Sequence, residues 1–186
     1  MVTNDARIAL LNGLPKGSIG AEIGVYNGDY SNAILSIVKP RELHLIDPWK
    51  FQNDKKYADS WYGGKEMNQE HMDSIYHSVE TRFSDQIKNG IVRIHRLPSS
   101  SAATAFTDNY FDWVYIDGNH LYEYVKSDLE NYYQKLKVGG CLACDDYGTL
   151  GWWEDGVLKA VHEFLGTHNC RVAFAMATQI VIKKTA

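Results

Sequence analysis

The sequence predicts an α/β fold in which one domain, residues 1–186, forms a mostly parallel β-sheet with helices on both faces. Strand-like and helix-like segments alternate along the chain, which is the pattern of a doubly wound parallel sheet. Residues 111–116 (FDWVYI) are nearly continuous in apolar character, as expected of a strand covered on both faces. The last two strand-like segments, 171–177 and 179–183, have no helix between them. They predict a closing hairpin and therefore one antiparallel strand at the end of the sheet.

Four elements are expected before residue 47, and sequence signals mark several of their ends. Gly13 and Pro15 end a leading helix, and Asp47-Pro48 ends the second strand. Apolar residues at every third or fourth position favour a helix after the first strand. The expected segments are helix 8–14, strand 18–24, helix 31–38 and strand 42–46.

The rest of the chain continues the alternation after one long interruption. Residues 49–88 follow the second strand, and apolar residues from Met67 to Phe83 recur there at helical spacing. Gly139-Gly140 ends a later helix. The expected segments are strands 91–97, 111–116 and 141–144 and helices 122–136 and 155–165.

Composition and charge exclude several classes of protein. The 19 basic and 23 acidic residues give a net charge of −4, and the basic residues are dispersed, so no basic face for nucleic acid is expected. No apolar run approaches the roughly 20 residues of a membrane span, and the N-terminus does not resemble a signal peptide. Three cysteines are too few for a disulfide framework. We therefore expect a soluble cytoplasmic protein without a nucleic-acid or membrane partner; the oligomeric state, a homo-oligomer included, stays open.

The ends of the first two strands carry residues that suit a nucleoside. Glu22, Gly24 and Gly28 follow one another at the first strand-to-helix turn, where glycine lets the backbone approach a ligand closely. The dinucleotide fingerprint G-x-G-x-x-G is absent, because the glycines stand at positions 20, 24 and 28. Asp47 follows the second strand, 23 residues after Gly24, and its carboxylate can accept both hydroxyls of a ribose. Either feature alone also fits an ordinary turn; together they predict a nucleoside site.

Three aspartates follow the fourth and fifth strands. If these strands are neighbours, Asp117, Asp145 and Asp146 meet at one edge of the sheet, where their mutual repulsion favours a bound cation. Oxygen ligands favour Mg²⁺, with Ca²⁺ or Mn²⁺ as further candidates. The alternative is that Asp117 or Asp145 only caps a loop or helix. His120, three residues after Asp117, is a candidate proton acceptor, although a lone histidine is more often a surface or capping residue.

The C-x-x-C sequence at Cys141 and Cys144 is interpreted as structural. On a strand these two side chains point to opposite faces, and no second pair or suitably spaced histidine completes a zinc site.

These residues together resemble the class I S-adenosylmethionine-dependent methyltransferases. The resemblance rests on the Glu22-x-Gly24-x-x-x-Gly28 loop, on 43–47 (LHLID) and, more specifically, on the combination of 117–120 (DGNH) with 145–147 (DDY). Within the class the sequence looks like the small metal-dependent O-methyltransferase group that includes macrocin O-methyltransferase, and more distantly like catechol O-methyltransferase. The resemblance covers residues 18 to 183.

The resemblance implies a Rossmann-like seven-stranded sheet, with the last strand antiparallel, and S-adenosylmethionine as cofactor. It implies a divalent cation, Mg²⁺ or another, and a histidine base, which is His120 here. The cofactor-binding positions carried over are Glu22, Gly24, Gly28, Asp47, Ser100 and Asp117. The metal positions carried over are Asp117, Asp145 and Asp146. The catalytic residues carried over are His120 and, in a second role, Asp117. Where relatives often have Gly-Asp-Ser after the third strand, this chain has 98–100 (PSS), so only Ser100 is carried over there.

The resulting hypothesis is O-methylation of a small hydroxylated acceptor such as a sugar. A metal would lower the pKa of a hydroxyl, and two neighbouring hydroxyls could chelate it. Residues 49–88 are expected to form a lid that selects the acceptor. Aromatic residues after the second and fifth strands are expected to border the site, unless they only pack in the core. They are Trp49, Tyr57, Trp61, Tyr62, Tyr147, Trp152 and Trp153.

Two alternatives stand beside this hypothesis. A nucleotide-dependent oxidoreductase or epimerase would bind phosphate at the first loop, where Glu22 would repel it, and no Tyr-x-x-x-Lys pair follows the fourth strand. A cofactor-binding subunit without catalytic activity is the non-enzymatic alternative; the presence of His120 and all three aspartates speaks mildly against it.

Overall fold

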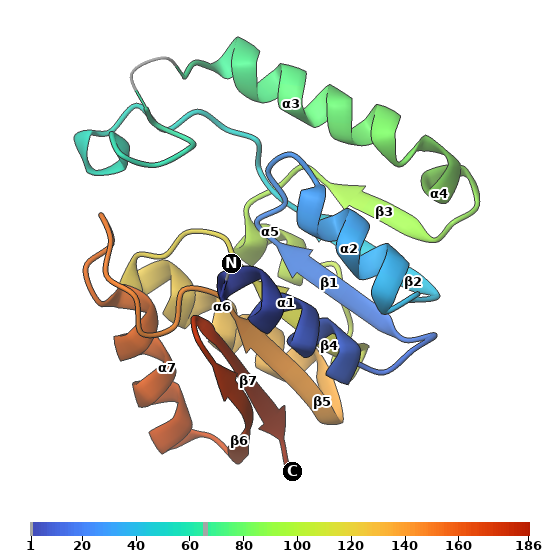
Figure 1. The fold of residues 1–186 in the computed structure, drawn as a ribbon, viewed down its shortest axis with the longest axis vertical. Coiled ribbons are helices and arrows are strands. Elements are labelled where there is room, and N and C mark those ends of the chain that lie inside the picture. Colours follow the sequence, from blue (N-terminus) through green and yellow to red (C-terminus); the bar gives the residue numbers. More distant parts are fainter. Residues whose placement is uncertain (1, 65–66) are drawn as a thin grey trace.

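The computed structural model describes residues 2–64 and 67–186, in which helices surround one β-sheet (Figure 1). The helices are α1 (Val2–Gly13), α2 (Asp29–Ile37), the 3₁₀ helix η1 (Lys55–Tyr57), α3 (Gln69–Arg82), α4 (Ser84–Lys88), α5 (Ser99–Ala103), α6 (Tyr122–Lys135) and α7 (Gly156–Thr167). The strands are β1 (Ile19–Ile23), β2 (Glu42–Ile46), β3 (Val92–His95), β4 (Phe111–Ile116), β5 (Leu136–Cys144), β6 (Cys170–Met176) and β7 (Gln179–Lys184). No helix within the described residues is long and apolar enough to cross a membrane.

The seven strands form one sheet in the order β3-β2-β1-β4-β5-β7-β6. The first five strands of the chain pair in parallel, whereas β7 is antiparallel to both β5 and β6. The predicted seven-stranded sheet with an antiparallel last strand is therefore confirmed. The antiparallel strand does not form the edge, however: β7 lies between β5 and β6, so the hairpin places β6 on the outside of the sheet.

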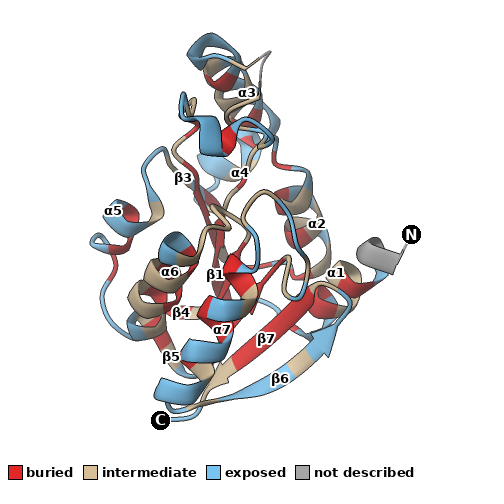
Figure 2. Cartoon of the chain, turned by 90° about the vertical axis from the view of Figure 1, so that its left-hand side faces the viewer, coloured by how far each residue is buried: buried red, intermediate tan, exposed pale blue. Residues whose placement is uncertain are grey.

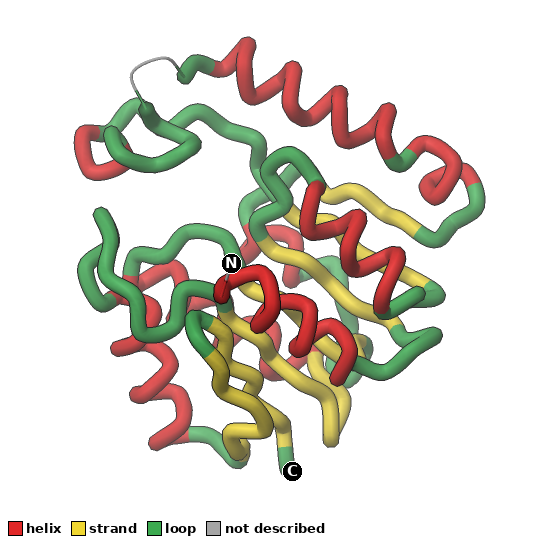
Figure 3. The backbone as a smooth tube through the Cα atoms, viewed as in Figure 1, coloured by secondary structure: helices red, strands yellow, loops and turns green. Residues whose placement is uncertain are grey.

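Helices cover both faces of the sheet, as Figure 3 shows by element type. On one face, α1, α2 and α3 contribute Leu11, Ile34 and Val79 to a buried apolar cluster. On the other face, α6 and α7 contribute Leu129 and Val161 to a second cluster. The sheet between the two layers is largely buried, apart from the exposed edge strand β6 (Figure 2). The two-layer covering explains why β4 is nearly continuous in apolar residues.

Two local features differ from the expectation. Residues 136–140 belong to β5 and not to a helix end, since Leu136 already pairs with Phe111 of β4. A register irregularity follows, where Gly139 has a φ of 80°, a conformation that glycine adopts readily. The short helix α5 after β3 was not expected from the sequence.

The register of the sheet places the ends of three strands side by side. Ile23 at the end of β1 pairs with Ile116 at the end of β4, which pairs with Cys144 at the end of β5. The backbone ladder continues one step further: the N–H of Asp117 donates to Ile23 at 2.8 Å, and the N–H of Asp145 donates to Ile116 at 3.0 Å. The residues after each strand therefore begin at one rim of the sheet.

Candidate active site

A cavity of about 920 Å³ opens at this rim. Its walls come from α1, from the loops after β1, β4 and β5, and from residues 59–62 of the long segment after β2. Six acidic side chains line it, and the only lysine or arginine among its described lining residues is Arg7. The acidic residues are Glu22, Asp29, Asp59, Asp117, Asp145 and Asp146. Such a cavity favours ligands that carry positive charge and disfavours phosphates.

The glycine loop after β1 lies directly against the end of β4. Gly24 has a φ of 87°, and a Cβ at this position would overlap the carbonyl oxygen of Asp117. Gly28 has a φ of 78° and immediately precedes α2, where a Cβ would lie 2.8 Å from the ring of Phe83. Both predicted glycine positions are thus required by the backbone, and Gly24 also lines the cavity.

Glu22 is an acidic group that the fold buries at the cavity wall. Its side chain is 1% exposed, and its Oε2 accepts a hydrogen bond from Ser31 of α2 at 2.5 Å. Burial raises the pKa of Glu22 to about 8, with nearby Asp117 and Asp47 contributing in the same direction. Glu22 is therefore mainly protonated at neutral pH unless a cationic group lies beside it.

Asp47 is placed close to the glycine loop but is covered. Its carboxylate accepts hydrogen bonds from the backbone N–H groups of Val25 at 2.9 Å, Tyr26 at 3.0 Å and Trp49 at 2.7 Å. The hydroxyl of Tyr62 donates a further hydrogen bond to it. Asp47 is 1% exposed and does not line the cavity, because Tyr62 lies over it. A ribose could reach this carboxylate only if Tyr62 moved.

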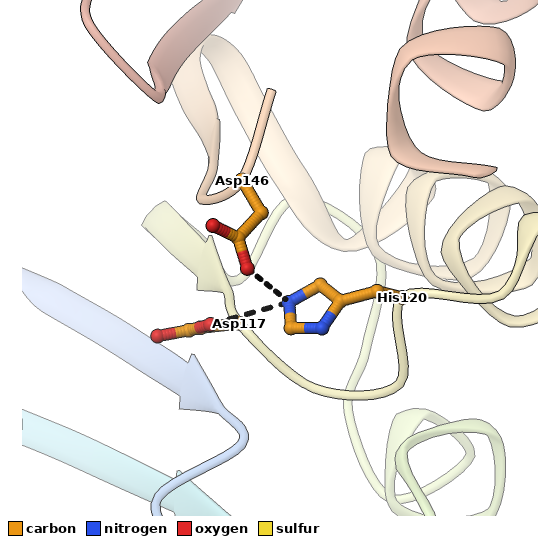
Figure 4. Close-up of side chains that lie close together, drawn as sticks. All are labelled: Asp117, His120 and Asp146. Atoms are coloured by element: carbon orange, nitrogen blue, oxygen red, sulfur yellow. Dashed lines mark ion pairs between the residues drawn. The ribbon is translucent and has the colours of Figure 1, made fainter. Parts of the chain in front are cut away.

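Asp117, His120 and Asp146 converge on one point of the cavity (Figure 4). The Nε2 atom of His120 lies 3.3 Å from Oδ1 of Asp117 and 3.6 Å from Oδ2 of Asp146. This Nε2 atom is buried and has no hydrogen-bond partner among the described residues. One ligand atom from each of the three residues lies within 4.8 Å of the others, which is compact enough for a metal ion.

Asp145 lies beside this group but faces another set of partners. One of its oxygens accepts hydrogen bonds from the backbone N–H of Asp146 at 2.8 Å and from the side chains of Thr178 and Gln179. The other forms an ion pair with Arg7 of α1. The structure therefore brings together Asp117 and Asp146 from the predicted aspartate trio, with His120 as their third member, while Asp145 holds Arg7.

Ser100 and several of the predicted aromatic residues lie away from the cavity. Ser100 is exposed on α5 and does not line the cavity; its neighbour Ser99 donates to the buried carboxylate of Asp128 at 2.5 Å. Trp49 is fully buried, and Tyr147 contacts His162 at 3.0 Å. The aromatic residues that do line the cavity from the two predicted segments are Trp61, Tyr62, Trp152 and Trp153.

The segment after β2 spans the cavity from one side to the other. Tyr57 accepts a hydrogen bond from the side-chain amide of Asn119 at 2.8 Å, and its ring lies 5.3 Å from that of Trp152. On the other side, Trp61 lies 5.0 Å from the ring of Tyr26. These contacts are compatible with the predicted lid over residues 49–88, of which 65 and 66 lie outside the described residues.

Sequence reasoning missed Arg7 and the contact between Tyr62 and Asp47. Arg7 is 110 residues from Asp117 in sequence, and its Nη2 atom lies 3.1 Å from that carboxylate. It lies in the middle of α1, whereas only the end of this helix, residues 8–14, was expected from the sequence, and the polar residues before it were assigned no role.

The family model described as "Methyltransferase domain" matches residues 21–147, more than half of the chain. This range contains the glycine loop, Asp47 and the group formed by Asp117, His120 and Asp146. The chain belongs to this family, which confirms the predicted class, an S-adenosylmethionine-dependent methyltransferase. Among curated proteins no sequence match is found.

Solved structures of other methyltransferases are similar to this chain over nearly its whole length. The O-methyltransferase NovP is 19% identical, with a TM-score of 0.63 over 98% of this chain and 79% of that chain. A Streptococcus mutans protein described as a methyltransferase, in complex with SAH, is 14% identical. Its TM-score is 0.62 over 99% of this chain and 98% of that chain. The Burkholderia thailandensis 1,6-didemethyltoxoflavin-N1-methyltransferase is 12% identical, with a TM-score of 0.59 over 99% and 80%. At these identities the similarity concerns the fold.

The raised pKa of Glu22 predicts a pH-dependent stability difference. The unfolded chain loses the Glu22 proton near pH 4.5, but the folded chain keeps it until about pH 8. The free energy of unfolding of the wild type should therefore fall over this interval relative to Glu22→Gln, by on the order of a few kcal/mol. Urea denaturation of both proteins at pH 5 and pH 9 measures this difference. The exposed Glu123→Gln is the matched control, and parallel pH profiles for wild type and Glu22→Gln would contradict the assignment.

Proposed function

We propose that this protein transfers a methyl group from S-adenosylmethionine to a hydroxyl oxygen of a small acceptor such as a sugar, with the help of a divalent cation. The observation that carries the proposal is a single cavity that joins the Glu22–Gly24 loop to the group formed by Asp117, His120 and Asp146. A methyl donor and an ionisable acceptor site would then lie side by side, as direct transfer requires.

The choice of donor is supported by the family and by the chemistry of the loop. The sulfonium and ammonium groups of S-adenosylmethionine are cationic, and the described residues that line the cavity include six acidic side chains against one arginine. Gly24 lets a ligand approach the backbone. The structures of the Streptococcus mutans protein and of the Burkholderia thailandensis enzyme both contain S-adenosylhomocysteine (SAH), the product that S-adenosylmethionine leaves after methyl transfer. For this chain Asp47 is the proposed ribose ligand.

The choice of an oxygen acceptor rests on His120. Transfer forms a bond between the acceptor oxygen and the methyl carbon and breaks the bond between that carbon and sulfur, which becomes a neutral thioether. The acceptor hydroxyl must lose its proton. Nε2 of His120 can take this proton, because it is a buried nitrogen with no hydrogen-bond partner in the part of the chain that the structure describes. Asp117 and Asp146 stabilise the imidazolium that results, because they lie 3.3 and 3.6 Å from this nitrogen.

The residues present fit a divalent cation. Asp117 and Asp146 offer carboxylate oxygens within one compact group, and these are the ligands that Mg²⁺ prefers, which leaves the imidazole of His120 free as a base. Asp145 would join the ligands only by releasing Arg7. When bound, the cation lowers the pKa of a hydroxyl group beside it.

The cavity walls favour a small neutral or cationic acceptor. Trp61, Trp152 and Trp153 line the cavity from two segments, and aromatic rings pack well on sugar rings. Six acidic side chains against one arginine disfavour phosphate-bearing acceptors, nucleic acid included. Two neighbouring hydroxyls on a ring would suit both the aromatic walls and the cation.

Ligand binding tests the choice of donor. We expect S-adenosylmethionine to bind in the micromolar range and NAD not to bind, as measured by isothermal titration calorimetry. Asp47→Ala should abolish cofactor binding, because the loop that Asp47 organises and the proposed ribose contact are both lost. The exposed Asp85→Ala serves as the matched control. Tight binding of NAD, or unchanged binding by Asp47→Ala, would contradict the proposal.

Chelation and substitution test the cation. EDTA, or Asp146→Ala, should reduce turnover of a hydroxylated acceptor at least 100-fold and change the affinity for S-adenosylhomocysteine by less than about threefold, because the cation acts on the acceptor. His120→Gln should reduce turnover by roughly 10²–10⁴-fold even when Mg²⁺ saturates. Turnover that survives EDTA but not His120→Gln would leave the histidine as the only group that activates the acceptor.

A further inference from the structure

The free edge of β6 is an exposed apolar feature that the proposed methyl transfer does not use. β6 is the outermost strand of the sheet, so one side of its backbone has no neighbouring strand in the described chain. It packs mainly on β7, and five of its seven residues are exposed (Figure 2). Val172 and Met176 are 44% and 42% exposed. An edge of this kind offers backbone N–H and C=O groups and apolar side chains to a further strand.

The opposite edge of the sheet has features that discourage such pairing, and β6 has few of them. β3 is only four residues long and contains Arg93 and His95. In β6, six of the seven residues are apolar, and the one charged residue, Arg171, lies next to its first residue. Short length, charged side chains and bulges are the usual means by which edge strands avoid pairing. The bulge of β6 lies between Val172 and Phe174, and extended backbone continues on both sides of it.

The end of the β6–β7 hairpin at which β6 begins is basic. In the register of the two strands Arg171 lies opposite Lys183, and Cys170 lies opposite Lys184. Arg171 is exposed, and Lys183 is partly exposed. Three positive charges therefore gather at this end of the hairpin.

The other end of the hairpin, at the turn between β6 and β7, lies beside acidic residues. The side chain of Thr178 in this turn donates to Asp145 at 3.1 Å, and its carbonyl oxygen accepts the N–H of Tyr147 at 2.9 Å. Asp145 is paired with Arg7. Asp146 is 28% exposed at its side chain and forms no ion pair with a lysine or arginine of residues 2–64 and 67–186. The two ends of the hairpin thus carry opposite charge.

We propose that a second copy of this chain docks on β6, edge to edge and antiparallel, across a two-fold axis near the middle of the strand. Each basic end then lies near the acidic turn of the other copy, whereas a parallel arrangement would bring like charges together. The half of β6 that contains Val172 lies against the half that contains Met176, so water is excluded from both side chains. The sheets of the two copies join into one.

A second copy is the occupant that this edge fits, because a two-fold contact requires a surface that is complementary to itself. The edge of β6 meets this requirement, since it carries both signs of charge at opposite ends and apolar residues between them. Pairing through one strand buries less surface than a standard interface, so a dissociation constant of about 1–100 µM is expected. The inference does not depend on the proposed function.

Sedimentation velocity between about 1 and 500 µM protein tests the association. The wild type should change from monomer to dimer over this range. Val172→Lys should weaken the dimer at least about tenfold, because it places an ammonium group in the contact. Ile87→Lys is the matched control: Ile87 is an exposed aliphatic residue of α4, which packs beside β3 at the opposite edge of the sheet. It should associate like the wild type.

Charge reversal and hydrogen exchange test the orientation and the place of the contact. Arg171→Glu brings an acid near the acidic turn of the partner copy and should weaken the dimer about 3- to 10-fold. The exposed Arg41→Glu, which lies just before β2, is its control and should leave the dimer unchanged. Amide exchange of residues 170–176 should be slower at high than at low protein concentration in the wild type but not in Val172→Lys.

Several outcomes would overturn the proposal. A wild type that stays monomeric at the highest concentration excludes the contact. A dimer that Val172→Lys leaves intact, or that Ile87→Lys weakens equally, is held by another surface. Association that continues beyond two copies contradicts a two-fold contact, because such a contact closes at the dimer. If Val172→Lys does not fold, as judged by its thermal transition, Arg171→Glu at its exposed position provides the comparison.

Discussion

The site depends on hydrogen bonds that continue the parallel ladder one residue beyond the strands. The N–H of Gly24 donates to the end of β2, that of Asp117 to the end of β1 and that of Asp145 to the end of β4. These bonds fix the first residue of each loop before any side chain contributes. The carboxylates after β4 and β5 are therefore brought within reach of one arginine and one histidine by backbone geometry alone. A shift of register between β1 and β4 would separate all of them.

The acidic side chains that lie together at these strand ends need hydrogen-bond or ion-pair partners inside the protein. Asp145, which is 2% exposed, receives two side-chain hydrogen bonds, one backbone hydrogen bond and the ion pair with Arg7. Within residues 2–64 and 67–186, the Glu22 side chain has only Ser31 as a hydrogen-bond partner, and burial raises the pKa of Glu22. Asp117, His120 and Asp146 lie between these extremes, partly exposed and incompletely hydrogen-bonded. Groups of this kind interact with a ligand more strongly than fully satisfied ones, because no existing contact has to be broken.

Much of the fold could be predicted because its signals are local. Apolar periodicity and glycine positions indicate each main element, and the uninterrupted hairpin indicates the antiparallel strand. The position of β7 inside the sheet depends on long-range pairing with β5, which no local pattern encodes. The same distinction holds for the site. The strand ends indicated Asp117, His120 and Asp146, whereas the sequence could not tell which of the two adjacent aspartates lies beside Asp117 and His120. Asp146 turns away from Asp145 with a φ of 54°. The contacts of Arg7 and Tyr62 join distant segments and were not predictable for that reason.

Tyr62 occupies the fourth hydrogen-bonding position of a carboxylate whose other three are filled by backbone. A ribose hydroxyl of the methyl donor that takes this position replaces the O–H group of Tyr62 with its own. The number of hydrogen bonds at Asp47 therefore changes little. The strength of nucleoside binding then depends on what the displaced phenol finds elsewhere. Sequence changes around residue 62 would thus tune the affinity for the methyl donor through the new position of this phenol.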